Sequence, residues 1–342
     1  MMRKLYIVFL ITLFSVAARA QIGGEYTYQF LELTNSARIA ALGGVQVAIT
    51  DSSDLNLPYH NPSLLHSDMS HRVLVNYVNY LADVNYGYAS YARHYEGIGN
   101  FAVGMHYINY GKFDEALETG ELTGVTFKAA EYALNLIYAN RYKRLNYGIN
   151  LKPILSSFES YQSFGIAADL GVNLSSKSGL TSFGLVARNI GTQITTYYRD
   201  GDREKIPFNL QMGITQRLKH APLVFSATMQ HMNVWDLASP DEEPEFSMET
   251  IYEYDEGFVK QFMRHMVFGV EFLPSKSFTL RAGYNYQRRQ ELKFDSKAST
   301  VGFSAGFGLK IKRFRLDYGI SRFHLAGSSN LFSLSINLND NY

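Results

Sequence analysis

The 342-residue sequence predicts an all-β fold: a transmembrane antiparallel β-barrel of about 14 strands with an N-terminal hatch, or plug segment. Three observations support this prediction. Apolar and polar residues alternate along most of the chain from Arg72 onward. The connections between these alternating stretches are short and long in turn. After residue 20, no stretch is continuously apolar for the ~20 residues that a helical span needs. Only helices and closed barrels satisfy their backbone hydrogen bonds within a membrane, so membrane residence would require a barrel.

The alternation is clearest between Leu331 and Asn339, where the even positions are apolar and the odd positions are small and polar. Successive side chains of an extended strand point to opposite faces, so this stretch has one apolar face and one polar face. The other expected strands are clear at 101–107, 164–174, 208–214, 278–286, 301–311 and 314–320, and less regular at 72–81, 84–95, 131–142, 146–156, 182–190, 222–232 and 265–273.

The connections favour a barrel over a soluble β-sandwich, which could use similar strands. Short turns at one rim and long loops at the other are typical of a meander that crosses a bilayer back and forth. We therefore expect a short-turn rim and a long-loop rim, with both termini in the periplasm. The short turns are expected at 96–99, 143–146, 175–180, 218–222, 274–277 and 311–313, and the longer loops at 110–130, 156–163, 190–206, 232–264, 287–299 and 322–330, with the short link 81–84 as an exception.

Charged residues within the strands identify the face that must avoid lipid. Asp169, Glu271, Arg281, Lys310 and Asp317 all fall on the non-apolar side. A charge facing lipid costs about 2–4 kcal/mol at the bilayer midplane, so these side chains are expected to face the lumen. Many glycines lie on the same side, which leaves space for something packed inside.

The composition excludes several classes of function. The formal net charge is +1, which gives no electrostatic support for nucleic-acid binding. Charged residues make up 18% of the chain, whereas a soluble surface carries about a quarter to a third. The absence of cysteine rules out disulfides, thiolate metal sites, thiol catalysis and a lipid-modified N-terminal cysteine.

Residues 1–20 have the pattern of a secretory signal peptide. Arg3 and Lys4 supply the positive start, residues 5–16 the apolar run, and residues 18–20 a small-x-small cleavage site. The apolar run is shorter than the ~20 residues of a membrane anchor. We expect cleavage after Ala20 and localisation in the outer membrane of a Gram-negative bacterium, with a signal peptide at 1–20, a hatch at 21–70 and a barrel at 71–342.

Residues 21–70 do not alternate and contain three short motifs. Pro62 fixes its own φ and keeps Asn61 out of the helical region, so this pair predicts a rigid turn, either in a hatch or on an ordinary surface. We expect Arg38 to pair with a lumen carboxylate such as Asp169 or Glu271. The motifs are Ser36-Ala37-Arg38, Leu42-Gly43-Gly44 and Asn61-Pro62-Ser63.

These motifs resemble the N-terminal hatch of FadL-like outer-membrane barrels. Within that group the mature chain resembles the PorV/PorQ family of the Bacteroidetes type IX secretion system, and by length its PorQ branch. The resemblance implies a non-enzymatic secretion component that docks a PorZ-like surface partner. The alternative is a FadL-like transporter of hydrophobic small molecules.

The long connection between Asn233 and Gln261 is the expected docking loop, because it interleaves acidic and aromatic residues. Aromatic anchors within a polar rim suit protein interfaces. A passive solvated loop is the alternative, and Trp235 would also suit the membrane interface. The residues expected to dock the partner are Trp235, Asp236, Asp241, Glu242, Glu243, Phe246, Tyr252 and Tyr254.

The sequence predicts neither an enzyme nor a metal protein, and we expect no cofactor. The nine histidines lack the spacings of metal sites. His94, His106 and His324 are candidate bases, but no positioned nucleophile accompanies them. Gly302, Gly306 and Gly308 alternate along a strand and open no helix, so they do not form a phosphate loop.

Overall fold

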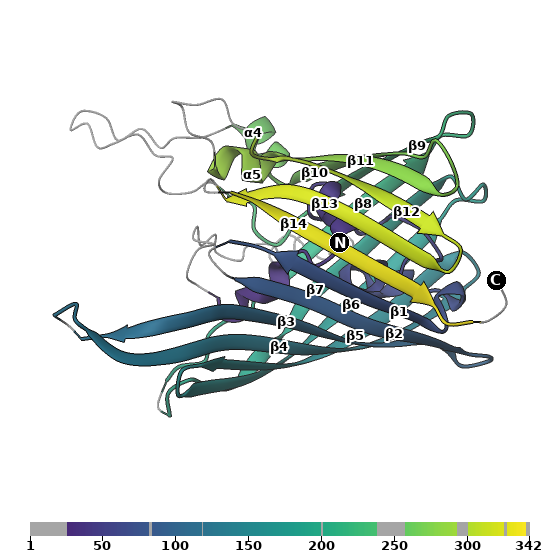
Figure 1. The fold of residues 1–342 in the computed structure, drawn as a ribbon. Coiled ribbons are helices and arrows are strands. Elements are labelled where there is room, and N and C mark those ends of the chain that lie inside the picture. The colour runs from purple at the N-terminus through teal and green to yellow at the C-terminus, as the bar shows by residue number, and fades with distance from the viewer. Residues whose placement is uncertain are drawn as a thin grey trace, which may run out of the picture.

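The barrel is closed, because its first strand pairs with its last. The computed structural model describes residues 26–81, 84–117, 119–199, 201–237, 257–292, 300–324 and 327–339. Each of fourteen antiparallel strands pairs with its sequence neighbours, and the first also pairs with the last. Val75 on the first strand lies opposite Ala89 on one side and opposite Leu334 on the other. The predicted 14-stranded antiparallel barrel is therefore confirmed (Figure 1).

The described elements comprise the barrel strands and several short helices. The strands are β1 Arg72–Asn79, β2 Asn85–Tyr95, β3 Gly99–Ala116, β4 Leu122–Tyr142, β5 Leu145–Phe158, β6 Tyr161–Ser175, β7 Thr181–Thr195, β8 Asn209–Arg217, β9 Leu223–Met229, β10 Met266–Phe272, β11 Phe278–Asn285, β12 Phe303–Ile311, β13 Phe314–His324 and β14 Gly327–Asn337. The helices are η1 Gln29–Glu32, α2 Ala37–Ala41, α3 Leu57–His60, η2 Pro62–Leu64, η3 Ser67–Met69, α4 Phe258–Arg264 and α5 Tyr286–Glu291.

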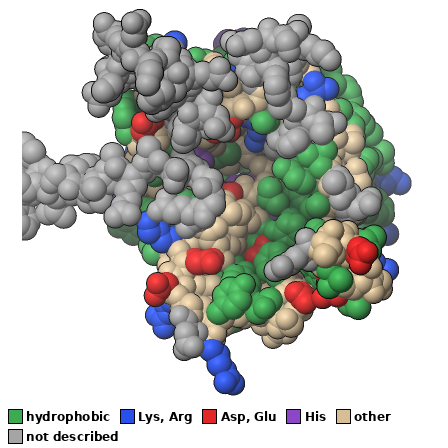
Figure 2. Space-filling view, turned by 90° about the vertical axis from the view of Figure 1, so that its left-hand side faces the viewer, with side chains coloured by type: hydrophobic (Ala, Val, Ile, Leu, Met, Phe, Trp, Pro, Cys, Tyr) green, Lys and Arg blue, Asp and Glu red, His purple; other side chains and the backbone are tan. Residues whose placement is uncertain are grey.

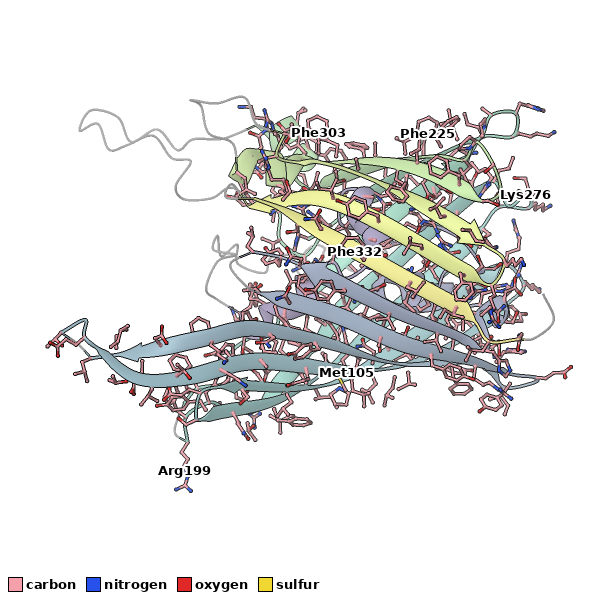
Figure 3. All side chains as sticks on the ribbon, in the orientation of Figure 1. Met105, Arg199, Phe225, Lys276, Phe303 and Phe332 are labelled. Atoms are coloured by element: carbon pink, nitrogen blue, oxygen red, sulfur yellow. The ribbon has the colours of Figure 1, made fainter. Side chains whose placement is uncertain are left out.

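The two faces of the wall differ as the alternation predicts. On β14, Phe332 is 45% exposed whereas the neighbouring Ser333 is buried. Figure 3 shows Met105, Phe225 and Phe332 pointing away from the barrel. Within the described ranges, no helix is long and apolar enough to cross a membrane. The wall therefore has an outward face of apolar side chains and an inward face of polar ones.

The five charged residues predicted to face the lumen lie on the inner side of the wall, and four of them are buried. Asp169, Glu271, Arg281 and Asp317 are buried on the inner face. Lys310 lies one residue before the end of β12, where it is exposed but lines the same pocket as Asp51 and Arg315. The prediction that Lys310 lies on the inner side of the wall is therefore confirmed, at the edge of the barrel.

The short turns are confirmed, but only some of the long loops are. Long connections separate β7 from β8, β9 from β10 and β11 from β12. In contrast, only residues 159 and 160 connect β5 to β6, and β13 and β14 are paired as far as His324 and Gly327. The expected loop 110–130 is instead mostly strand, and this part of β3 and β4 projects beyond its neighbours (Figure 1).

One predicted strand ends earlier than its alternation indicates, and another begins later. β11 ends at Asn285, whose side chain accepts a hydrogen bond from the Arg288 amide at 3.0 Å and caps α5. Such an N-cap starts a helix despite the alternating sequence around it. β12 correspondingly begins at Phe303, after the connection, and not at Val301.

The N-terminal segment, defined here as residues 26–70, packs against the inner face of the wall (Figure 1). Glycines in the wall allow its backbone to approach closely. A methyl group at Gly283 would lie 2.2 Å from the Gly43 nitrogen, and one at Gly184 would lie 2.1 Å from the Val47 carbonyl oxygen. The spaces left by these inward glycines are therefore filled by the N-terminal segment.

Candidate functional site

The first N-terminal motif places a short helix against the wall. Ser36 caps α2 by accepting a hydrogen bond from the Ile39 amide at 3.4 Å. The Ala37 amide, free at the helix start, donates to the Ser333 hydroxyl of β14 at 3.0 Å. This cap and the wall contact fix the direction in which Arg38 leaves the helix.

The second motif turns the chain at the end of α2. Gly43 and Gly44 have φ values of +100° and +96°, which side chains other than glycine rarely adopt. The Gly43 amide donates to the Ser304 hydroxyl of β12 at 3.0 Å, and the Gly44 carbonyl accepts from Thr34 at 2.5 Å. The turn is thus tied both to the wall and to the preceding part of the N-terminal segment.

The third motif is buried, so it is not an ordinary surface turn. The Asn61 amide group donates to the Val47 carbonyl at 2.8 Å. The Asn61 side-chain oxygen accepts hydrogen bonds from both the amide and the hydroxyl of Ser63, at 3.1 and 2.7 Å. Pro62 then begins η2, as its fixed φ favours at a helix start. The motif therefore joins two distant parts of the N-terminal segment.

Arg38 is the centre of a buried ionic network. Its guanidinium donates to Glu271 of β10 through two nitrogens, at 2.9 and 2.7 Å. A third nitrogen donates to Asp51 at 2.9 Å and to Asp54 at 2.8 Å. Of the two partners predicted for Arg38, Glu271 is correct. Asp169 is not, because it pairs with Lys152 at 2.6 Å.

Two arginines of the wall extend the network. Arg315 of β13 contacts Asp51 at 2.9 Å, Asp54 at 3.2 Å and Asp317 at 2.8 Å. Arg281 of β11 lies 2.9 Å from Glu271 and 2.7 Å from Asp317. The network therefore holds three arginines and four carboxylates, with a formal charge of −1. It joins the N-terminal segment to one side of the barrel.

The arginines keep the aspartates of this network ionised. Burial by itself would raise the pKa of Asp54, but Arg315 and Arg38 lower that pKa to about 2. The same two arginines hold the pKa of Asp51 well below its usual range, again against the effect of burial. Asp51 and Asp54 are therefore ionised at neutral pH, and each has an arginine as its ionic partner.

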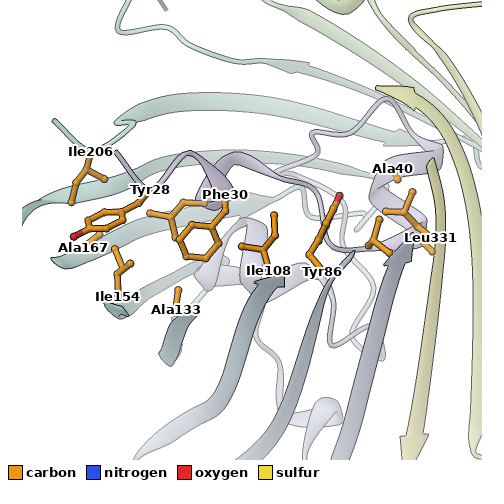
Figure 4. Packing of buried hydrophobic residues seen from close by; sticks show 13 residues of the cluster. Tyr28, Phe30, Ala40, Tyr86, Ile108, Ala133, Ile154, Ala167, Ile206 and Leu331 are labelled. Carbon is orange, nitrogen blue, oxygen red and sulfur yellow. The ribbon is translucent and has the colours of Figure 1, made fainter. Parts of the chain in front are cut away.

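An apolar layer separates this network from the long-loop rim. We use the term for the buried cluster around Tyr28, Phe30 and Leu31, which packs against inward residues of the wall such as Ile108 and Ile154 (Figure 4). The Tyr28 hydroxyl lies 2.5 Å from the Ser163 hydroxyl, and burial raises the pKa of Tyr28 to about 12. The layer is thus built from neutral side chains.

Above the apolar layer lies a group of aromatic side chains that we call the rim recess: Tyr110, Phe158 and Tyr197. The ring of Phe158 lies 5.6 Å from that of Tyr110 and 5.9 Å from that of Tyr197. All three are only partly buried, and Tyr110 also packs against the apolar layer. Figure 2, which looks onto the long-loop rim, shows a hollow there with hydrophobic side chains along its wall.

The sequence analysis did not identify the rim recess. Tyr110 and Phe158 were assigned to the loops 110–130 and 156–163, whereas they lie in β3 and β5. The available signal was that apolar positions continue at a spacing of two beyond the expected strand ends. On β3 this places Ile108 and Tyr110 on the inner face, where the sequence predicts polar residues.

The predicted docking residues are described only in part. Trp235 stacks on Phe258 of α4 at 5.3 Å and on His265 at 5.4 Å, and Asp236 accepts a hydrogen bond from Gln261 at 2.8 Å. Phe258 is 71% exposed. The ends of the predicted loop therefore carry an exposed aromatic stack. The remaining predicted docking residues, Asp241, Glu242, Glu243, Phe246, Tyr252 and Tyr254, lie outside the described residues.

The described residues form no metal site. Among the residues that the structure describes, no group of three or more His, Cys, Asp or Glu side chains is placed to hold an ion. The neighbouring carboxylates Asp51 and Asp54 are instead paired with Arg38 and Arg315.

Comparison with known proteins identifies the fold. No protein-family model and no curated protein matches the sequence. Among solved structures, a deltaS2 mutant of the TodX monoaromatic hydrocarbon channel matches with a TM-score of 0.52 and 12% identity, over 90% of this chain and 100% of that one. The Pseudomonas putida toluene transporter TodX matches with a TM-score of 0.51 and 12% identity, over 89% and 96%.

The chain has the β-barrel fold of the TodX structures. A Pseudomonas aeruginosa FadL homologue is also among the similar structures, with a TM-score of 0.49 and 9% identity over 90% of this chain and 99% of that one. The two TodX structures are described as a channel and a transporter. None of these comparisons points to a secretion system.

Proposed function

We propose that this barrel admits hydrophobic small molecules from the long-loop rim of the outer membrane. The observation that carries the proposal is the rim recess, because its three partly exposed aromatic rings adjoin a buried apolar layer inside a FadL-like barrel. Apolar surface that leaves water is stabilised by about 25 cal/mol per Å², so such a recess favours apolar ligands over polar ones. In this proposal residues 1–20 are removed on export and residues 21–70 act as the hatch.

The layout of the lumen defines the path that we propose. Below the apolar layer the inner face carries Asn135, Asn150, Lys152 and Asp169, all buried. A hydrocarbon cannot form hydrogen bonds with these polar groups. Placing it beside them would remove polar contacts and raise the free energy. We infer that a ligand does not continue along the barrel axis past the layer but leaves sideways through the wall.

The exit that we favour lies between β8 and β9. The ladder of these strands runs only from Met212 to Arg217 on β8, so the first residues of β8 have no strand partner on that side. Instead, the Leu210 carbonyl accepts a hydrogen bond from the Met232 amide at 2.9 Å, and the Leu210 amide donates to the Asn233 side-chain oxygen at 3.1 Å. The neighbouring Asn209 donates to Glu32 of the N-terminal segment at 2.7 Å. A movement of Glu32 would therefore weaken the wall at the same place.

The experiment is uptake of radiolabelled toluene and of a radiolabelled long-chain fatty acid into proteoliposomes. Phe158→Trp fills the rim recess without adding charge, and we expect it to lower the initial rate severalfold. Tyr77→Trp is the matched control, because Tyr77 is an aromatic residue on the outer face. Rates no higher than those of protein-free liposomes for both substrates would contradict the proposal.

A second proposal is that the barrel docks a PorZ-like surface protein as a component of type IX secretion. The specific observation in its favour is the exposed stack of Trp235 on Phe258, since aromatic side chains are enriched at protein interfaces. Deletion of residues 238–256 should leave the barrel heat-modifiable and release the surface partner into the medium. An unaltered amount of partner at the cell surface would refute this second proposal.

A further inference from the structure

Two apolar grooves lie side by side on the outer face of the wall. One, of about 610 Å³, crosses β2 to β5, and the other, of about 530 Å³, crosses β4 to β8. Both are lined by Tyr138 and Ile149, which form the ridge between them. Because these side chains belong to the lipid-facing row of the wall, whatever occupies the grooves comes from the membrane.

One basic residue lines the larger groove, and another lies in the short turn that precedes a strand of the smaller groove. Arg93 lines the larger groove, and its guanidinium lies 5.8 Å from the ring of Tyr95. Lys143 lies in the turn before β5, which begins at Leu145. It precedes Tyr147, which lines the smaller groove, by four residues. The Lys143 ammonium lies 5.2 Å from the ring of Tyr142. Both cations are therefore held over outward-facing aromatic rings.

This arrangement fits the boundary between hydrocarbon and headgroups. Tyrosine rings are enriched at that depth, and lysine and arginine near it extend their charge toward the headgroups. On β2 and β3, Tyr95 and Phe101 pack at 5.7 Å, and Phe101 packs on Tyr138 at 5.1 Å. The aromatic cluster thus marks the level of the interface, and the grooves extend from it into the hydrocarbon.

The short-turn rim as a whole is also positively charged. Its six turns, at 96–98, 143–144, 176–180, 218–222, 273–277 and 312–313, contain one glutamate, Glu96, and seven lysines or arginines. Arg313 also lies over an aromatic ring, with its guanidinium 5.4 Å from the ring of Phe314. A surface of this sign attracts anionic lipid headgroups and repels cationic partners. The basic residues are, in sequence order, Lys143, Arg144, Lys177, Lys219, Lys276, Lys312 and Arg313.

We propose that the two grooves bind one anionic phospholipid of the leaflet at the short-turn rim. Its two acyl chains lie on either side of the Tyr138–Ile149 ridge, and its phosphate is bound at the rim by Arg93 and Lys143. This inference is independent of transport, because it concerns the outer face of the barrel and not the lumen. In an outer-membrane barrel with its short turns in the periplasm, that leaflet consists of phospholipid.

The test is native mass spectrometry of the full-length barrel in detergent, with phosphatidylglycerol or phosphatidylcholine added. We expect one phosphatidylglycerol to bind more tightly than phosphatidylcholine. Replacing both cations, Arg93→Gln with Lys143→Gln, should weaken phosphatidylglycerol binding roughly tenfold or more and remove the preference for it. The matched control is Lys112→Gln with Arg199→Gln, two exposed cations toward the opposite rim, which should bind phosphatidylglycerol as the parent does.

A second variant tests the grooves separately from the charges. Leu136→Trp fills the larger groove and should weaken the binding of both lipids, whereas Leu316→Trp elsewhere on the outer face should not. Equal binding of the two lipids by the parent would overturn the proposal. So would an unchanged affinity for phosphatidylglycerol in the double glutamine variant or in Leu136→Trp. Heat-modifiability on gels verifies that every variant is folded.

Discussion

Arg38 and Glu271 lie 233 residues apart in the sequence and are joined by two hydrogen bonds of 2.9 and 2.7 Å inside the barrel. Arg38 belongs to the N-terminal segment and Glu271 to β10. Both side chains are buried, and the same guanidinium also bonds Asp51 and Asp54. This contact makes the position of the N-terminal segment dependent on the wall.

The first prediction concerns removal of the Arg38 charge. Arg38→Met leaves Glu271 and two aspartates buried with fewer partners, and we expect the free energy of unfolding to fall by about 3–5 kcal/mol. Guanidinium titration of the barrel in lipid vesicles measures this change. Arg38→Met combined with Glu271→Leu should recover part of the loss, because the unpaired carboxylate is then absent. Arg199→Met, at an exposed position, is the control.

The second prediction concerns acid. The pKa of Asp54 is lowered from 3.8 to about 2 in the folded protein, so Asp54 stabilises the fold above its unfolded pKa. That stability, about 2 kcal/mol at 1.36 kcal/mol per unit, is lost as the pH falls through 4 toward 2. Unfolding measured between pH 7 and pH 5 should therefore change little through this group. Asp54→Asn should make the fall below pH 4 shallower, and an identical fall in the variant would contradict the assignment.

Alternation predicted the wall well because it is a local property. Whether Ser333 or Leu334 faces the lumen follows from position along one strand, and both lie where the sequence places them. Strand ends were predicted less well because they depend on partners. Residues around Gly120 and Gly124 alternate weakly, yet β3 and β4 remain paired there, as the register of Ala116 with Leu122 shows.

The contents of the lumen were the hardest part to predict. The choice between Asp169 and Glu271 as the partner of Arg38 depends on how the N-terminal segment sits inside the closed barrel. Two strands can present equivalent inward carboxylates, and no local pattern distinguishes them. The rim recess was missed for a related reason, since its rings come together only when β3, β5 and the connection after β7 are assembled.

The third prediction concerns the glycine contact between the wall and the N-terminal segment. A side chain at Gly283 would meet the backbone of Leu42 and Gly43 at 2.2 Å, which is closer than atoms can approach. Gly283→Val should therefore displace the segment and lower the free energy of unfolding by about 1–3 kcal/mol. If the segment blocks the lumen, the conductance of liposomes containing the variant should rise.

The matched control for Gly283→Val is Ala282→Val. Ala282 is the preceding residue on β11, and its side chain points outward. The added methyl groups then face lipid, so neither stability nor conductance should change appreciably. Equal effects of the two variants would mean that the strand itself, and not the contact with Gly43, is sensitive to the added bulk.

The last prediction tests the apolar layer as the barrier in the lumen. Phe30 is 1% exposed, and its ring packs 5.3 Å from that of His106 on β3. Phe30→Ala removes a large buried ring and should lower the free energy of unfolding by about 3–5 kcal/mol. A smaller side chain also leaves a cavity in the layer, so the initial rate of toluene uptake per folded barrel should rise. Phe158→Trp, in the rim recess above, should lower it.

The opposite signs of these two effects distinguish a barrier from a general loss of structure. Damage to the fold would lower uptake in Phe30→Ala in proportion to the lost heat-modifiable protein. A barrier in the layer would instead raise the rate per folded molecule while the total amount of folded protein falls. Uptake per folded barrel that is unchanged or lower in Phe30→Ala would show that Tyr28, Phe30 and Leu31 do not limit passage.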